Sequence, residues 1–133
     1  MADEAVCIET PTRFARYTVA DGAGIAIGTV LQLTDPNTAA AQTADGVAFA
    51  GIAWEEKTAS DGILEITAAL NGIWDMTDGG TGSNVGAMVC CDGSANETRA
   101  AVAGDLLTGT VIGKNLEAAG ANEVSRVRVG EVI

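Results

Sequence analysis

This chain of 133 residues contains no histidine, so the usual general base, catalytic-triad member and zinc ligand is missing. Two glycine-rich segments, residues 22–28 and 80–86, imitate the GxGxxxG loop that binds dinucleotides. That loop needs a helix after it, because the helix N-terminus faces the pyrophosphate. Here both segments continue into strand-like stretches, GTVLQL and AMVCC. We therefore expect no nucleotide cofactor.

Acidic side chains offer the other candidate chemistry. The pairs Asp75/Asp78 and Glu55/Glu56 could act as acid and base, but turns and strand edges leave such carboxylates solvated. The segment GGTGSN, residues 79–84, is similar to one turn of the calcium-binding GGxGxD repeat, with Asn in place of the Asp. One degenerate copy does not build the stacked oxygen cage that calcium requires. The sequence thus predicts no enzyme, no cofactor and no metal site.

Cysteine and tryptophan remain as residues with special chemistry. Three cysteines, of which Cys90 and Cys91 are adjacent, make a poor disulfide framework. A strand places these two on opposite faces, so we expect structural thiols. Trp54 and Trp74 are the largest side chains. They are predicted in the core or an oligomer interface, because an aromatic sugar-binding platform normally combines more than two rings with polar neighbours.

The charge balance limits the partners. Eighteen acidic and seven basic residues give a net charge of -11, and the basic residues form no stripe. A phosphate footprint needs such a stripe, so we expect no nucleic-acid partner. No apolar run has the length of a membrane span, and the start MADEAVCIETP does not read as a signal peptide. The sequence predicts synthesis in a host cytoplasm without export and no membrane partner.

The apolar composition points to self-association. Hydrophobic residues make up 47% of the chain, but only two Phe, two Trp and one Tyr supply aromatic bulk. A large side chain contributes about 1.5–3 kcal/mol when fully buried, so a core that depends on Ala is thin. We expect additional stability from oligomerisation or docking.

The candidate residues described above lie on short apolar or alternating segments. Turns that contain Gly, Asp and Asn separate these segments. Their spacing of about 8–12 residues predicts an all-β fold, a small barrel or sandwich of short antiparallel strands. TAAAQTA, residues 38–44, is predicted as a further strand, and residues 104–107 as one helical turn. No strong repeat is visible, although residues 24–33 and 104–116 share a cadence. The predicted strands are 24–33, 47–54, 62–67, 71–75, 85–91, 109–113 and 124–129.

The chain divides into two parts. Residues 1–13 lack strand periodicity and are predicted as an extended N-terminal arm without partners in the domain. Residues 14–133 are predicted as a single β domain, whose pattern begins with FARYTV.

The order of elements resembles the small phage capsid-decoration, or cement, proteins. The matching elements are Gly24 to Leu33, Phe49 to Ala53, Gly62 to Ile66, Asn71 to Trp74 and Gly109 to Gly113. The resemblance covers about Tyr17 to Val129. It implies a β-rich, usually trimeric protein without catalysis. Such a protein lies on the outer surface of the virion head and ties neighbouring major capsid subunits together.

With a capsid as the partner, we expect the arm of residues 1–13 to make the contact. It would add a strand to an exposed capsid edge, with charged anchors at its root. The alternative function is a carbohydrate-binding or adhesion module of a virion or cell surface, which requires Trp54 and Trp74 to be exposed. The predicted capsid-binding residues are Glu9, Thr10, Pro11, Thr12, Arg13 and Arg16.

Overall fold

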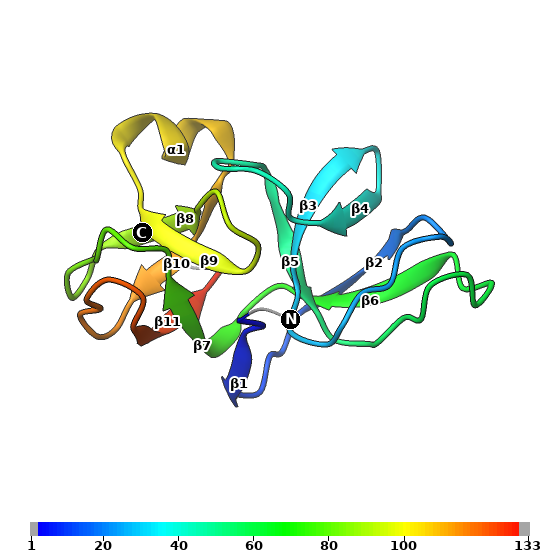
Figure 1. Cartoon of the computed structure of the whole chain (residues 1–133), viewed down its shortest axis with the longest axis horizontal. Coiled ribbons are helices and arrows are strands. Elements are labelled where there is room, and N and C mark those ends of the chain that lie inside the picture. Colours follow the sequence, from blue (N-terminus) through cyan, green and yellow to red (C-terminus); the bar gives the residue numbers. More distant parts are fainter. Residues whose placement is uncertain (1–2, 131–133) are drawn as a thin grey trace.

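The computed structural model describes residues 3–130. Strands account for 46% of the chain and helix for 5%, which confirms the predicted all-β fold. The strands close into two small barrels that lie side by side (Figure 1).

The first barrel contains β2 (Phe14–Thr18), β3 (Val30–Asp35), β4 (Thr38–Ala41), β5 (Phe49–Ala53) and β6 (Glu65–Ala69). The second contains β7 (Gly72–Asp78), β8 (Met88–Cys91), β9 (Glu97–Ala100), β10 (Val111–Asn115) and β11 (Val124–Val129). Helix α1 (Ala103–Thr108) connects β9 to β10, and β1 (Val6–Glu9) pairs with β7. Neighbouring strands are antiparallel except in the pairs β2–β4 and β7–β9, which close the two barrels.

The two barrels repeat one topology. In each, the first strand pairs with the third and fifth, the second with the third and fourth, and the fourth with the fifth. A main-chain bond outside the strands repeats too, because the N–H of Gly28 donates to Ala53 and that of Gly86 donates to Asn115. Residues 24–33 therefore correspond to residues 82–91, and the cadence shared with residues 104–116 was misleading.

The fourth strands contain the clearest sequence trace of this repeat. FAGIAWE (residues 49–55) corresponds to VIGKNLE (residues 111–117), with a glycine and a glutamate at equivalent places. The carboxylate of Glu55 accepts a hydrogen bond from the N–H of Thr67 at 2.8 Å. Its equivalent, Glu117, accepts one from the N–H of Arg126 at 3.1 Å. Each glutamate thus ties the loop after the fourth strand to the fifth strand.

The barrels meet through a common apolar cluster. Val30 and Ile52 of the first barrel belong to the same buried cluster as Trp74 and Cys91 of the second. The hairpin between β8 and β9 adds polar contacts, since the side-chain oxygen of Asn96 accepts a hydrogen bond from the N–H of Val30 at 2.8 Å. The side chain of Gln42 in turn bonds the main chain of this hairpin.

Most predicted strands are present, with shifted ends. The stretch TAAAQTA forms β4, the predicted helical turn lies within α1, and residues 124–129 form β11 as expected. Residues 24–29 are wrong as a strand, because they form a loop with a single bridge from Ile25 to Lys57. The strand predicted over residues 71–75 is longer, since β7 runs to Asp78.

The prediction that the arm lacks partners within the domain is wrong. Val6 and Cys7 pair with Asp75 and Trp74 of β7. The N–H of Ala5 also donates to the carbonyl oxygen of Gly28 at 2.9 Å. The apolar run VCI supplies strand propensity that the acidic neighbours and the following proline obscured. The arm is therefore part of the second sheet.

Deleting residues 1–10 should lower the free energy of unfolding by at least about 2 kcal/mol, because several main-chain hydrogen bonds of about 1 kcal/mol each are lost. Urea denaturation measures the change. The control is Val6→Thr, an exposed position of β1 that keeps the pairing and should change stability by no more than about 0.5 kcal/mol. An unchanged midpoint after the deletion would show that β1 adds nothing to the fold.

Candidate interaction surfaces

Three aromatic rings form a row at the junction of the barrels. Phe14 and Trp54 have ring centroids 5.6 Å apart, and Trp54 meets Trp74 edge-on at 6.0 Å. Trp74 is 1% exposed and lies in the core, Trp54 is partly buried, and Phe14 is 44% exposed. The adhesion alternative required both tryptophans to be exposed, and for Trp74 that requirement is not met. The exposed ring is Phe14, which the sequence did not single out.

The root of the arm is fixed to the turn between the barrels. The N–H groups of Thr12 and Arg13 donate to the side-chain oxygen of Asn71 at 2.9 and 3.1 Å. Pro11 is buried beside this turn, and an added Cβ on Gly72 would lie 3.3 Å from it. Residues Glu9 and Thr10 line a shallow pocket with Arg128. These residues are thus held by the fold; Glu9, Thr10, Thr12 and Arg13 are exposed, and Pro11 is not.

The two arginines proposed as anchors differ in their surroundings. Arg16 lies 3.5 Å from a carboxylate oxygen of Glu55 and 3.4 Å from one of Glu65, and it donates to Thr67 at 2.9 Å. The guanidinium of Arg16 is therefore engaged within the first barrel. Arg13 is exposed, and no side-chain partner of it is found among residues 3–130. Arg13 is the better placed of the two for an external carboxylate.

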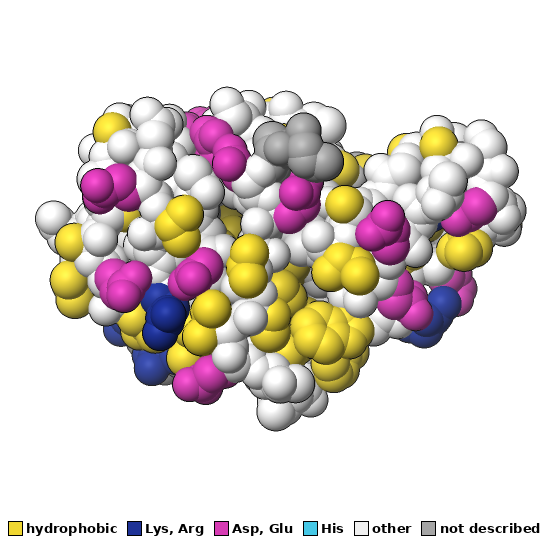
Figure 2. Space-filling view, turned by 60° about the horizontal axis from the view of Figure 1, so that its bottom comes forward, with side chains coloured by type: hydrophobic (Ala, Val, Ile, Leu, Met, Phe, Trp, Pro, Cys, Tyr) yellow, Lys and Arg dark blue, Asp and Glu magenta, His cyan; other side chains and the backbone are white. Residues whose placement is uncertain are grey.

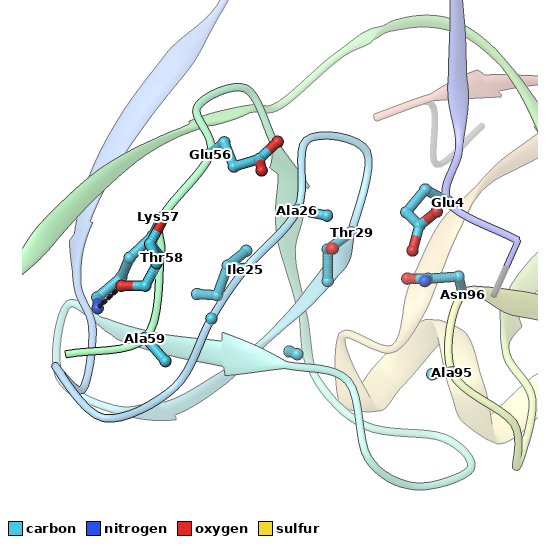
Figure 3. A pocket seen from close by; sticks show the side chains of 12 residues that line it. Glu4, Ile25, Ala26, Thr29, Glu56, Lys57, Thr58, Ala59, Ala95 and Asn96 are labelled. Atoms are coloured by element: carbon cyan, nitrogen blue, oxygen red, sulfur yellow. Dashed lines mark hydrogen bonds between the residues drawn. The ribbon is translucent and has the colours of Figure 1, made fainter. Parts of the chain in front are cut away.

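A groove of about 500 Å³ crosses the end of the first barrel (Figure 3). Its walls come from the loop before β3, the loop after β5 and the tip of the β8–β9 hairpin. Glu4 and Glu56 lie on its rim. The ammonium group of Lys57 is buried, where it donates to the main-chain oxygen of Asp21 at 2.6 Å and to Asp61 at 3.1 Å. The groove thus presents carboxylates and small side chains to a partner.

The second barrel has an equivalent groove of about 440 Å³. Gly82, Ser83 and Asn84 occupy the places of Gly24, Ile25 and Ala26 in the first groove. Sequence reasoning missed both grooves, because they follow from the repeat and the repeat is nearly invisible in the residues.

The interiors of the barrels differ in polarity at this end. The first barrel has five buried apolar residues there, Val19, Ile25, Ala39, Ala53 and Ile66. The second barrel has five buried polar residues at the equivalent places, Asp78, Ser83, Thr98, Asn115 and Ser125.

Asp78 organises the loop that resembled a calcium-binding repeat. One of its carboxylate oxygens accepts hydrogen bonds from the N–H groups of Gly80 and Gly82 at 2.9 and 2.8 Å. Ser125 donates to the side-chain oxygen of Asn115 at 3.1 Å, and Asn115 also bonds Ser83. The glycine N–H groups of GGTGSN therefore bind a buried carboxylate of the protein itself.

The adjacent cysteines are both buried. Cys90 lies under α1, with its sulfur 3.6 Å from a carboxylate oxygen of Asp105, and Cys91 lies in the shared cluster. Burial raises the pKa of each thiol to about 12. Cys7 is only partly buried, and burial raises its pKa as well.

At pH 8 iodoacetamide should therefore leave Cys90 and Cys91 unmodified in the folded protein, because the reactive thiolate is scarce and both sulfurs are shielded. Mass spectrometry of tryptic peptides measures the modification. The same reaction in urea, where all three thiols should be labelled, is the control. Fast labelling of Cys90 or Cys91 in the native protein would contradict the buried placement.

Comparison with known proteins does not assign this chain to a family. No protein-family model matches the chain, and no curated protein matches it. Among residues 3–130 no group of three or more acidic or cysteine side chains is arranged to hold a metal ion. The described part of the chain has no helix that is long and apolar enough to span a membrane.

Proposed function

We propose that this protein is a structural virion protein, without enzymatic activity, that binds the outer surface of a phage head and cements neighbouring major capsid subunits. In this proposal it acts as a homotrimer. The resemblance of its element order to capsid-decoration proteins suggests this role, and the surface features described above are compatible with it. Acidic side chains are spread over the face in Figure 2, which suits a partner other than the packaged DNA.

The observation that carries the proposal is the edge strand β1. It ends the six-stranded sheet, and among residues 3–130 it pairs with β7 alone, so its other side is open to a further strand. Val6 and Ile8 are 60% and 40% exposed, and the register with β7 shifts between Cys7 and Glu9. An open edge with exposed apolar side chains is a surface that natural proteins usually protect. Pairing with an extended capsid segment would cover it and use its main-chain groups for affinity.

The test is binding to undecorated heads of the phage that encodes the protein, measured by cosedimentation. Stoichiometric binding is expected for the wild type. Replacing both Val6 and Ile8 by Lys should weaken binding at least about tenfold, since apolar contacts are lost and charges are placed at the edge.

The control is Ile63→Lys, which changes an apolar residue of similar exposure, 44%, on a loop of the first barrel. It should bind as the wild type does. Absence of binding by the wild type would refute the cement function. Equal binding by the β1 variant would place the contact elsewhere on the protein.

A further inference from the structure

The contact between the two barrels is made from pieces that exist twice in the chain. Asn96 lies at the tip of the β8–β9 hairpin, has a φ of 65°, and reaches Val30 at the start of β3. Its equivalent at the tip of the β3–β4 hairpin is Asn37, which also has a positive φ, 52°. Asn37 is exposed, and within residues 3–130 its side chain has no hydrogen bond to the second barrel. One copy of this hairpin is therefore docked, and the other is free.

The apolar part of the contact follows the same pattern. Cys91, at the end of β8, is buried in the shared cluster, and its carbonyl oxygen accepts a hydrogen bond from Gly46 at 3.1 Å. Its equivalent at the same place in β3 is Leu33, which is 43% exposed. Leu33 is a larger apolar side chain in the less covered position.

The second barrel presents the receiving half of the contact, and none of residues 3–130 occupies it. Val30 and Phe49 receive the hairpin in the first barrel, and their equivalents are Met88 and Val111. These two residues line a mainly apolar groove of about 340 Å³. The other wall comes from α1 and the residues before it, where the exposed apolar side chains that line the groove are Val102 (68%) and Leu106 (49%).

The insertion that forms α1 replaces the loop of residues 43–48. In the first barrel this loop bonds the incoming hairpin through Gly46 and through Asp45, whose carboxylate is 2.6 Å from Arg99. In the second barrel the equivalent segment offers leucines, and the free hairpin offers Leu33. The free β3–β4 hairpin and the α1 groove are thus both apolar, so their surfaces are complementary to each other. Neither is complementary to the ionic pair of Asp45 and Arg99 that the contact inside the chain uses.

We propose that the β3–β4 hairpin of one copy of this protein docks in the α1 groove of the next copy, so that the contact between barrels is repeated between chains. In this arrangement Leu33 enters the groove beside Leu106, and Asn37 takes the place that Asn96 has inside the chain. The inference deepens the proposed homo-oligomer and rests on that part of the proposed function.

A contact between different surfaces closes a ring only if the rotation per copy allows it. The β3–β4 hairpin and α1 lie on the same side of the molecule, one on each barrel (Figure 1). Successive copies therefore turn strongly, which favours a closed ring of few chains. In the proposed homotrimer the ring would contain six barrels related by one kind of contact.

Sedimentation velocity of the purified full chain at micromolar concentration tests the proposal. The wild type should form one closed oligomer. Leu33→Lys and Leu106→Glu should each raise the dissociation constant at least about tenfold, because each places an unpaired charge in an apolar contact. Leu64→Lys, at 57% exposure outside both surfaces, is the control and should associate as the wild type does.

Two further variants separate a direct contact from a general effect on folding. The double variant Leu33→Lys with Leu106→Glu should recover association, because opposite charges then meet across the interface. Asn37→Gly keeps the positive φ and removes only the amide, so it should weaken association while the thermal midpoint stays near that of the wild type. Circular dichroism of each variant checks the fold.

Three results would overturn the inference: a monomeric wild type, single variants that associate normally, or a double variant weaker than either single one. Head binding is measured separately. A monomeric wild type that still decorates heads would refute this contact and leave the cement function standing. An oligomer that forms as expected but does not bind heads would refute the cement function and leave this contact standing.

Discussion

Gly113→Ala should lower the free energy of unfolding by at least about 3 kcal/mol. This is the largest loss of stability that we expect from a substitution that removes no interaction. Gly113 lies in β10 opposite Val129 of β11. A Cβ built on it would lie 2.1 Å from the carbonyl oxygen of Arg128 and 2.9 Å from the Cα of Val129. Both atoms belong to the backbone, so the strand itself must move. Urea denaturation with circular dichroism measures the loss.

The repeat provides a second site for the same test. Gly51 is the equivalent residue of β5, where a Cβ would lie 2.8 Å from the carbonyl oxygen of Ala69 and where φ is 148°. Gly51→Ala should also destabilise strongly. The matched control is Gly104→Ala in α1, where no atom lies within 4 Å of the added Cβ and alanine favours helix by about 0.5–1 kcal/mol. Wild-type stability of Gly113→Ala would mean that β10 and β11 are less closely packed than described.

Gly51 and Gly113 show why the individual strands were easier to predict than the repeat of the two barrels. Alternation and turn residues indicate a strand locally, and they predicted most strands to within a few residues. Equivalence between barrels depends on which side chains face inward, and those have been exchanged freely. Ala53 corresponds to Asn115 and Ile66 to Ser125, so an apolar interior and a polar one share a backbone without sharing a sequence pattern. The residue type is kept where the backbone comes close, as at Gly51 and Gly113, and at a few polar positions such as Glu55 and Glu117.

The candidate surfaces were predictable only in part. Of the predicted capsid-binding residues Pro11 is buried and the others are exposed, and the pairing of β1 with β7 depends on a partner more than sixty residues away. Local pattern does not contain that information. Trp74 was expected in the core or an interface and lies in the core cluster. The α1 groove could not be foreseen, because its significance comes from the equivalent contact inside the chain.

Asp105→Asn should cost about 3 kcal/mol at neutral pH, because it removes the charge from a buried, bonded carboxylate. Asp105 accepts hydrogen bonds from the N–H of Val102 at 2.8 Å, from Arg99 at 3.0 Å and from the hydroxyl of Thr110 at 3.0 Å. It therefore joins the start of α1 to β9 and β10. The hydrogen bonds from Arg99 hold the pKa of this carboxyl well below its ordinary value of 3.8.

The pH dependence of this loss has a definite sign. A carboxyl whose pKa is lowered by folding stabilises the protein above its unfolded pKa, and this contribution is lost as pH falls toward the folded value. The difference in unfolding free energy between wild type and Asp105→Asn should therefore be constant above about pH 5 and shrink below pH 4. Urea titrations at several pH values measure it.

Asp45→Asn is the matched control, because Asp45 contacts the same arginine at 2.6 Å but its side chain is 57% exposed. Exposed ion pairs contribute about 0–1 kcal/mol, so this variant should be only slightly destabilised. If both variants lose the same small amount, Asp105 is no more than a surface partner of Arg99. If Asp105→Asn loses about 3 kcal/mol and the loss does not shrink in acid, the asparagine disturbs the packing of α1 and the charge is not the cause. A loss that shrinks below pH 4 assigns the position of α1, and with it one wall of the groove, to this single carboxylate.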